Sequence, residues 1–293
     1  MKFLPTYKFA SERERGIALI LVTVSLFAIY DAISKYLTRF YPVAELLWVR
    51  YLAHVIFMLA VFGPRMRLNL VRTHRPVLQV LRAVLLIGSA SLFMLGVRYI
   101  PLADATAINF VTPLLLTALS VPMLGEKVET RNWVAVILGF AGVLVIVRPG
   151  GGELFQLAAL FPFLSACCTS FYQILTRKFR GAEKPLTMHF YTGMVGLIVT
   201  SLAWQSSWTI NSFAHGFLLA CHALSAGVGH YLLIEAFQRI GPAVAAPFTY
   251  AQLVFALLFG WAIYGEVPDT ISLFGILVIV GSGMYVARRQ NRK

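Results

Sequence analysis

Residues 103–126, ADATAINFVTPLLLTALSVPMLGE, and residues 243–266, AVAAPFTYAQLVFALLFGWAIYGE, are two copies of one pattern. Each copy begins with closely spaced alanines, continues as an apolar run and ends in a Gly-Glu pair, Gly125-Glu126 in the first and Gly265-Glu266 in the second. A second apolar run follows each pair. This recurrence is typical of a duplicated membrane protein.

A weaker match upstream extends the duplication to about half of the chain. Leu37-Thr38-Arg39 closes one apolar run, and Leu175-Thr176-Arg177 closes its counterpart. We therefore expect a first repeat at residues 16–148 and a second at residues 154–287, flanked by basic tails at residues 1–15 and 288–293.

The composition also indicates a membrane protein. Hydrophobic residues make up 59% of the chain and charged residues only 13%, and the mean hydropathy is +0.76. An ordinary soluble domain carries roughly 25% charged residues. A water-soluble fold therefore cannot bury this much apolar surface.

The apolar windows predict ten membrane-spanning helices. A helix needs about 20 predominantly apolar residues to cross a hydrocarbon core of about 30 Å. Windows of this kind lie near Gly16–Leu37, Val43–Phe62, Val77–Val97, Ala103–Leu124, Trp133–Val147, Leu154–Thr176, Met188–Trp208, Phe213–Ala236, Ala243–Tyr264 and Ile271–Ala287.

The net charge of +13 is distributed unevenly between the two sides of the membrane. Most Lys and Arg residues fall in the two tails and in alternate loops, whereas the loops between them hold Arg39, Arg98 and Arg148. By the positive-inside rule, both termini are cytoplasmic, in a multi-pass protein of the cell's inner membrane. The basic clusters thus indicate orientation and contact with lipid headgroups, and we expect no nucleic-acid partner.

Five spans per repeat is an odd number, so the second repeat must cross the membrane in the opposite orientation to the first. The expected fold is an all-α polytopic membrane protein of ten transmembrane helices in two inverted five-helix repeats. This architecture predicts a site at the midplane between the halves and alternating access to it. A secondary, gradient-driven transporter is the expected function.

Two other classes of membrane protein remain as alternatives. A polytopic enzyme needs an interfacial catalytic cluster, but His230 and Glu235 are five residues apart and no His-Glu-x-x-His motif exists. A channel or scaffold protein is the other alternative, although a selectivity filter usually shows a repeated carbonyl loop or a charged ring. The cysteines all fall inside apolar runs, and we expect neither a metal site nor a cofactor: Cys167, Cys168 and Cys221.

The chain resembles the drug/metabolite transporter superfamily, as a ten-helix member with two tandem EamA repeats. The resemblance covers residues 16–287 and rests on residues 31–37 (DAISKYL), Arg50, residues 101–106 (PLADAT), Pro113, the two Gly-Glu pairs and residues 139–142 (GFAG). It implies transport of a small organic metabolite. The Asp-x-x-x-Lys-Tyr-Leu element resembles branches associated with S-adenosylmethionine and riboflavin.

In the first repeat, charged residues within the apolar runs are candidate gating residues, because a charge in a bilayer costs about 2.5–3.5 kcal/mol on insertion scales. Asp31 and Lys35 share one helix face, and a short hairpin brings Arg50 to a similar depth. We expect these three to form one coupled unit in the outer half, either as an ion pair that locks two helices or as a gate. Trp48 belongs to the same half and is a candidate substrate-cavity residue, and Asp104 is expected to cap a helix.

In the second repeat, polar residues fall toward the cytoplasmic half. Tyr172 and Gln173, the counterparts of Ser34 and Lys35, are candidate substrate-cavity residues, and His230 and Glu235 are further gating candidates. Each alternatively makes only an interhelical hydrogen bond. These ionisable groups leave proton coupling open.

The substrate site is expected where the two copies of the opening pattern meet. We expect Asn109, Thr112 and Pro113 to face Thr249, Tyr250 and Gln252, because helices weakened by proline commonly form transporter sites at the midplane. Amide, hydroxyl and aromatic groups there suit a zwitterionic or aromatic metabolite, for example an amino-acid-like, S-adenosylmethionine-like or riboflavin-like molecule.

Overall fold

The computed structural model describes residues 12–66, 70–125, 128–148, 153–178, 183–203, 209–240 and 242–290. These residues are helical apart from short connections. In the described part of the chain the helices are α1 (Glu12–Leu37), α2 (Val43–Met66), α3 (Pro76–Tyr99), α4 (Leu102–Asn109), α5 (Thr112–Leu124), α6 (Thr130–Val147), α7 (Glu153–Lys178), α8 (Pro185–Leu202), α9 (Phe213–Arg239), α10 (Pro242–Thr249), α11 (Ala251–Tyr264) and α12 (Thr270–Gln290).

The all-α membrane architecture predicted from the sequence is confirmed. Within the described residues, eight helices are long and apolar enough to cross a membrane, and Thr270–Val286 is a shorter apolar helix. The shorter α8 runs between α7 and α9, and it ends at Leu202 although the apolar window was expected to reach Trp208. Trp208 lies outside the described residues.

Two of the spans are each broken into two helices at matching positions. α4 and α5 are separated at Phe110 and Val111, and α10 and α11 at Tyr250. Pro113 explains the first break: it has no N–H for the Asn109 carbonyl, which instead accepts a hydrogen bond from the Thr112 hydroxyl at 2.7 Å. Pro247 lies inside α10, so the second break comes after the proline and the first before it.

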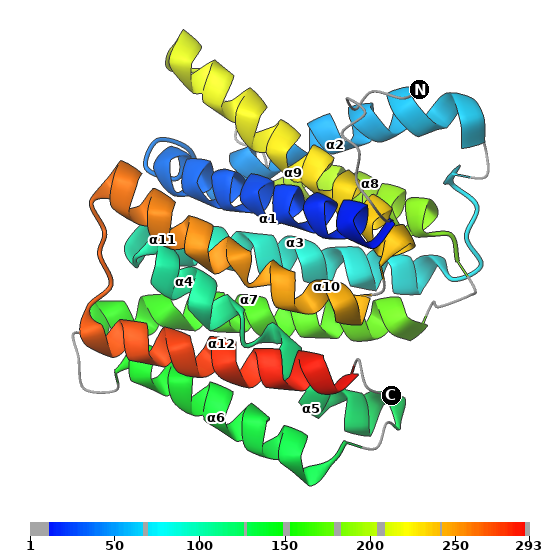
Figure 1. The fold of residues 1–293 in the computed structure, drawn as a ribbon. Helices are drawn as coiled ribbons and strands as arrows, with labels where there is room; N and C mark the ends of the chain where they lie inside the picture. Colours follow the sequence, from blue (N-terminus) through cyan, green and yellow to red (C-terminus); the bar gives the residue numbers. More distant parts are fainter. Residues whose placement is uncertain are drawn as a thin grey trace.

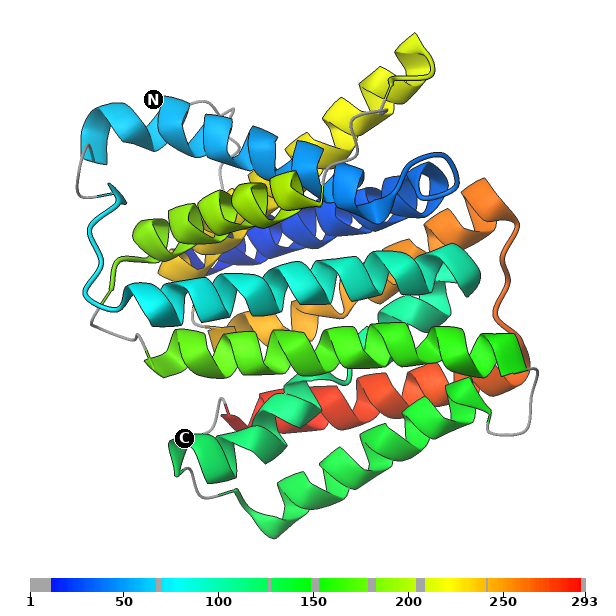
Figure 2. The same cartoon turned by 180° about the vertical axis from the view of Figure 1, so that it is seen from behind.

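The two repeats interlock and do not form separate lobes. α1 packs on α9, and α3 packs on α7, which are equivalent pairs under the duplication. Figures 1 and 2 show α1 and α9 on one side of the bundle and α3 beside α7. α6 packs on its own counterpart α12, where a Cβ at Gly142 would lie 2.9 Å from the Gly275 carbonyl oxygen. Glycine therefore allows this close approach.

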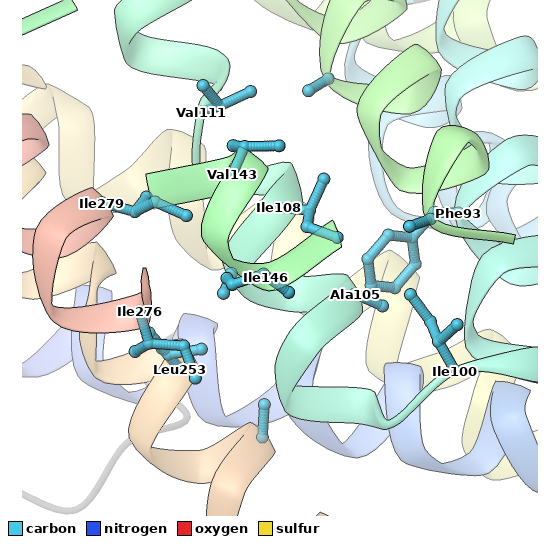
Figure 3. Close-up of a cluster of buried hydrophobic side chains, with 14 of the residues drawn as sticks. Phe93, Ile100, Ala105, Ile108, Val111, Val143, Ile146, Leu253, Ile276 and Ile279 are labelled. Carbon is cyan, nitrogen blue, oxygen red and sulfur yellow. The ribbon is translucent and has the colours of Figure 1, made fainter. Parts of the chain in front are cut away.

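The largest apolar core surrounds the broken helix of the first repeat. Figure 3 shows Ile108 and Val111 from this helix beside Val143 and Ile146 of α6 and Ile279 of α12. All of these side chains are buried. The first break is thus held between helices of both repeats.

The described ends of the chain lie at the same end of the bundle. α1 begins and α12 ends on the right of Figure 1. We call this the predicted inner end, because the sequence places both termini in the cytoplasm. The connections α1–α2 and α11–α12 lie at the opposite, predicted outer end.

Candidate functional site

The two helix breaks meet through an aromatic pair. The rings of Phe110 and Tyr250 stack with their centroids 4.8 Å apart and an interplanar angle of 28°. Both residues occupy the breaks themselves. The Tyr250 side chain is buried, and its hydroxyl has no hydrogen-bond partner. The two copies therefore meet at their breaks through Phe110 and Tyr250.

The polar residues around the first break point toward α7. The Asn109 amide donates from Nδ2 to the Ser165 hydroxyl at 3.0 Å, and the Thr112 hydroxyl bonds the Asn109 carbonyl within the break. Pro113 is the second residue of α5, and Thr249 is the last residue of α10. Asn109 and Thr112 thus fix the geometry of the break.

Asp31 contacts the second repeat instead of forming the expected ion pair. Gln252 donates from Nε2 to Asp31 Oδ2 at 2.9 Å, joining α11 to α1. Arg50 donates to the Tyr30 hydroxyl at 2.8 Å, and its guanidinium lies 4.9 Å from the centre of that ring. Asp31 and Arg50 are adjacent through Tyr30, but no ion pair joins them among the described residues. The Tyr30 side chain binds Arg50 in place of the direct Asp31–Arg50 pair that the sequence suggested.

Lys35 pairs with Glu266 and not with Asp31. Its Nζ lies 2.6 Å from Glu266 Oε1 and donates to the Ile100 carbonyl at 2.7 Å. The other carboxylate oxygen of Glu266 accepts a hydrogen bond from the Leu102 N–H at 3.0 Å. Lys35 is near the end of α1, so its long side chain extends toward the next connection and away from Asp31. We call Glu266, Lys35 and Leu102 the Glu266 junction.

The expected helix cap at Asp104 is a further correction. α4 begins at Leu102 with no side-chain cap from its own segment, and Asp104 lies within its first turn. The free N–H of Leu102 is instead satisfied by Glu266 from the other repeat. Asp104 lies three residues beyond Pro101, which occupies the N-cap position.

Tyr172 forms part of a cluster around a buried arginine. The Tyr172 hydroxyl accepts from Arg82 at 2.9 Å, and the guanidinium carbon lies 4.9 Å from the centre of the ring. Arg82 also donates to the Thr192 hydroxyl at 3.0 Å and to the Met188 carbonyl. Gln173 is half-buried on α7. Arg82 is not among the site residues predicted from the sequence, although a cation inside the third apolar run is a detectable signal.

The remaining candidate residues fall in different places. His230 stacks against His189 with ring centroids 5.7 Å apart, and His189 lies 4.1 Å from His54. Glu235 forms an ion pair with Arg239 of its own helix, at 2.7 Å. Trp48 donates from Nε1 to Ser201 at 2.9 Å, away from the breaks. Of these residues, only His230 joins a polar cluster in the interior.

An ion pair between Arg148 and Asp269 lies outside the membrane-spanning segments. Arg148 at the end of α6 contacts Asp269 in the connection before α12. The Arg148 guanidinium, together with the Ser272 N–H, lowers the pKa of the Asp269 carboxyl to about 2. This pair joins the end of α6 in the first repeat to the start of α12 in the second, at the predicted outer end.

The family follows from a match over most of the chain. The EamA-like transporter family model matches residues 14–148 and residues 156–287, once for each repeat. The chain belongs to the EamA-like transporter family. It is a multi-pass membrane transporter and not an enzyme, which confirms the family and the class of function expected from the sequence.

Relatives with different substrates cover nearly the full length. An S-adenosylmethionine uptake transporter of Rickettsia bellii is 28% identical over 92% of both chains. A riboflavin transporter of Rhizobium johnstonii is 26% identical over 100% of this chain and 98% of its own. A crystal structure with 18% identity has a TM-score of 0.65, covers 93% of this chain and 98% of its own, and supports the fold.

Proposed function

We propose that this EamA-like transporter is a gradient-driven carrier that moves a small zwitterionic or aromatic metabolite by alternating access. The observation that carries the proposal is the meeting of the two helix breaks at Phe110 and Tyr250. In inverted-repeat carriers the substrate binds between repeats where helices are discontinuous, because freed backbone groups and side chains are available there.

The chemistry around the breaks supports this substrate class. The stacked rings offer a flat apolar surface, and the buried Tyr250 hydroxyl, which lies against Gly283 of α12, has no hydrogen-bond partner. Asp31 and Arg50 bring opposite charges close to this surface. The relatives include proteins named as transporters of S-adenosylmethionine and of riboflavin. Both of these substrates contain aromatic rings that can stack on such a surface.

The alternating-access step has a structural counterpart in contacts between the repeats. The Asp31–Gln252 hydrogen bond and the Glu266 junction each join α1 to the second repeat. Movement of one repeat relative to the other must break such contacts. We further propose that the protein lies in the cell's inner membrane with both termini in the cytoplasm, as the Lys and Arg distribution favours.

Transport is tested with purified protein in liposomes. The substrate is first identified by comparing metabolites of cells with and without the gene, and its counterflow is then measured. We expect saturable exchange that Tyr250→Ala or Gln252→Ala abolishes or redirects to other substrates. Val254→Ala, on the exposed face of α11, is the matched control and should retain exchange. Normal flux and selectivity in both site variants would refute this location of the site.

Orientation needs a separate measurement. Reporter fusions at the C-terminus and in the α6–α7 connection should label opposite sides of the membrane. Labelling on the same side would contradict the odd number of spans per repeat.

A further inference from the structure

A polar cluster at the predicted inner end holds a buried arginine without an acidic partner. We define this Arg82 cluster as Arg82 of α3, His54 of α2, His189 of α8, His230 of α9 and Tyr172 of α7. Arg82 is 2% exposed, and the rings of His54, His189 and His230 follow one another at centroid distances of 4.1 and 5.7 Å.

The partners of Arg82 satisfy hydrogen bonds but do not neutralise its charge. They are two hydroxyls, from Tyr172 and Thr192, and the Met188 carbonyl. Within the described residues, no carboxylate forms an ion pair with Arg82. A buried cation without a counter-ion is costly in a membrane protein. The cluster is therefore electrostatically incomplete.

Unpartnered polar atoms gather around the same point. Arg82 Nε, His54 Nε2 and His189 Nε2 are buried and have no hydrogen-bond partner. His189 lies beside Met188 and one turn before Thr192, both of which bind the guanidinium. Arg82 Nε and His189 Nε2, the latter next to Met188, are thus unpartnered nitrogens at one positive charge, an arrangement that binds an anion.

Two features show that this geometry is built into the packing. A Cβ at Gly193 would lie 2.8 Å from the His54 ring, so glycine provides the space for that imidazole. His230 donates from Nδ1 to the Ala226 carbonyl at 2.9 Å, which orients its ring toward His189. The imidazoles are therefore held in place before any ligand binds.

We propose that the Arg82 cluster binds an anionic oxygen group of the transported substrate, a carboxylate or a phosphate. This inference rests on the proposed transport function and specifies its substrate class. Arg82 is enclosed by α3, α7 and α8, so the anion comes with a solute and not with a lipid headgroup.

The test measures anion binding without requiring transport. Thermal unfolding of the purified chain in lipid nanodiscs is followed with sodium benzoate, methionine and inorganic phosphate, and with benzamide and methioninamide as carboxylate-free matches. We expect a carboxylate or phosphate to raise the Tm in a saturable way, and the amides to have no such effect. Benzoate or methionine acting alone identifies a carboxylate site, and inorganic phosphate acting alone identifies a phosphate site.

The variants assign the binding to Arg82. Arg82→Gln should raise the anion concentration for half of the Tm increase by about tenfold or more, as expected for loss of a charged hydrogen-bond donor. Arg98→Gln removes an exposed arginine of the same helix and should leave the response unchanged. Should Arg82→Gln fail to fold, His54→Leu removes one free nitrogen and is expected to weaken the response severalfold.

The outcomes separate this inference from the transport proposal. No anion-dependent rise in the unmodified chain, or an equal rise in Arg82→Gln, overturns the anion site. An Arg82-dependent rise without substrate exchange in liposomes retains the site and refutes the carrier.

Discussion

The Gly-Glu pairs of the two repeats have the same backbone conformation at glycine. They differ in the residues that are available to bind the glutamate. Gly125 and Gly265 both end a helix in the left-handed conformation, with φ of 69° and 65°. Glu266 binds Lys35 and the Leu102 N–H from the first repeat. Glu126 lies outside the described residues.

The sequence positions that correspond to these partners carry different chemistry. The residue before Ala243 is Pro242, which has no N–H, where the first repeat has Leu102. Gln173 stands where the first repeat has Lys35. The second repeat thus lacks both the backbone donor and the cation of the Glu266 junction. Duplication preserves the left-handed helix end at both glycines, but not the residue types that bind Glu266.

Breaking the ion pair should have the largest effect on this asymmetry. Glu266→Ala leaves the Lys35 ammonium buried without its carboxylate, and we expect a loss of stability of roughly 3 kcal/mol. Lys35→Met combined with Glu266→Ala should recover part of this loss, because no unpaired charge remains. Thermal unfolding of the single and double variants measures the coupling, and strictly additive losses would contradict it.

Exchanging the aromatic residues of the two breaks tests whether they are interchangeable. Tyr250→Phe keeps the stacked ring but removes the free hydroxyl, so KM for the substrate should rise roughly tenfold with little change in Tm. Adding Phe110→Tyr to the Tyr250→Phe variant should not restore KM, because the new hydroxyl is attached to the first repeat and takes a different position. Full recovery in the double variant would show that the position of the hydroxyl is unimportant.

Leu102→Pro converts the start of α4 to the chemistry of α10. Proline is compatible with the first residue of a helix, so the change mainly removes the donor to Glu266. We expect a loss of about 1 kcal/mol in stability, measured by unfolding. Leu102→Ala retains the N–H and is the control for the lost side chain. An equal loss in both variants would assign the effect to packing.

The smallest effect is expected at Arg148 and Asp269, which lie outside the membrane-spanning segments. The folded pKa of Asp269, about 2, is below its ordinary value, so its stabilising contribution is present above about pH 4 and is lost as the pH falls toward 2. The Asp269 side chain is 53% exposed, which limits the contribution. Asp269→Asn should flatten the pH dependence of Tm in this range. An unchanged dependence of Tm on pH would show that ionisation of Asp269 does not contribute to stability.

The amino-acid sequence by itself determined the class of fold. Apolar runs of membrane-spanning length indicate transmembrane helices. The recurrence of residues 103–126 at 243–266 indicates a duplication, and the odd number of spans per repeat predicts that the repeats are inverted. These signals are local or periodic, so they do not depend on which helices touch. Pro113 also predicted a weakened helix near the position of the first break.

Only the tertiary structure decided the partners of the charged residues. Asp31, Lys35 and Arg50 are close together along the chain, yet Asp31 binds Gln252 and Lys35 binds Glu266. Arg82 and His54 bind residues of α7 and α8 that are far from them in sequence. Long side chains reach several ångströms along and between helices, so the packing of the two repeats, and not sequence spacing, selects the partner of each charge.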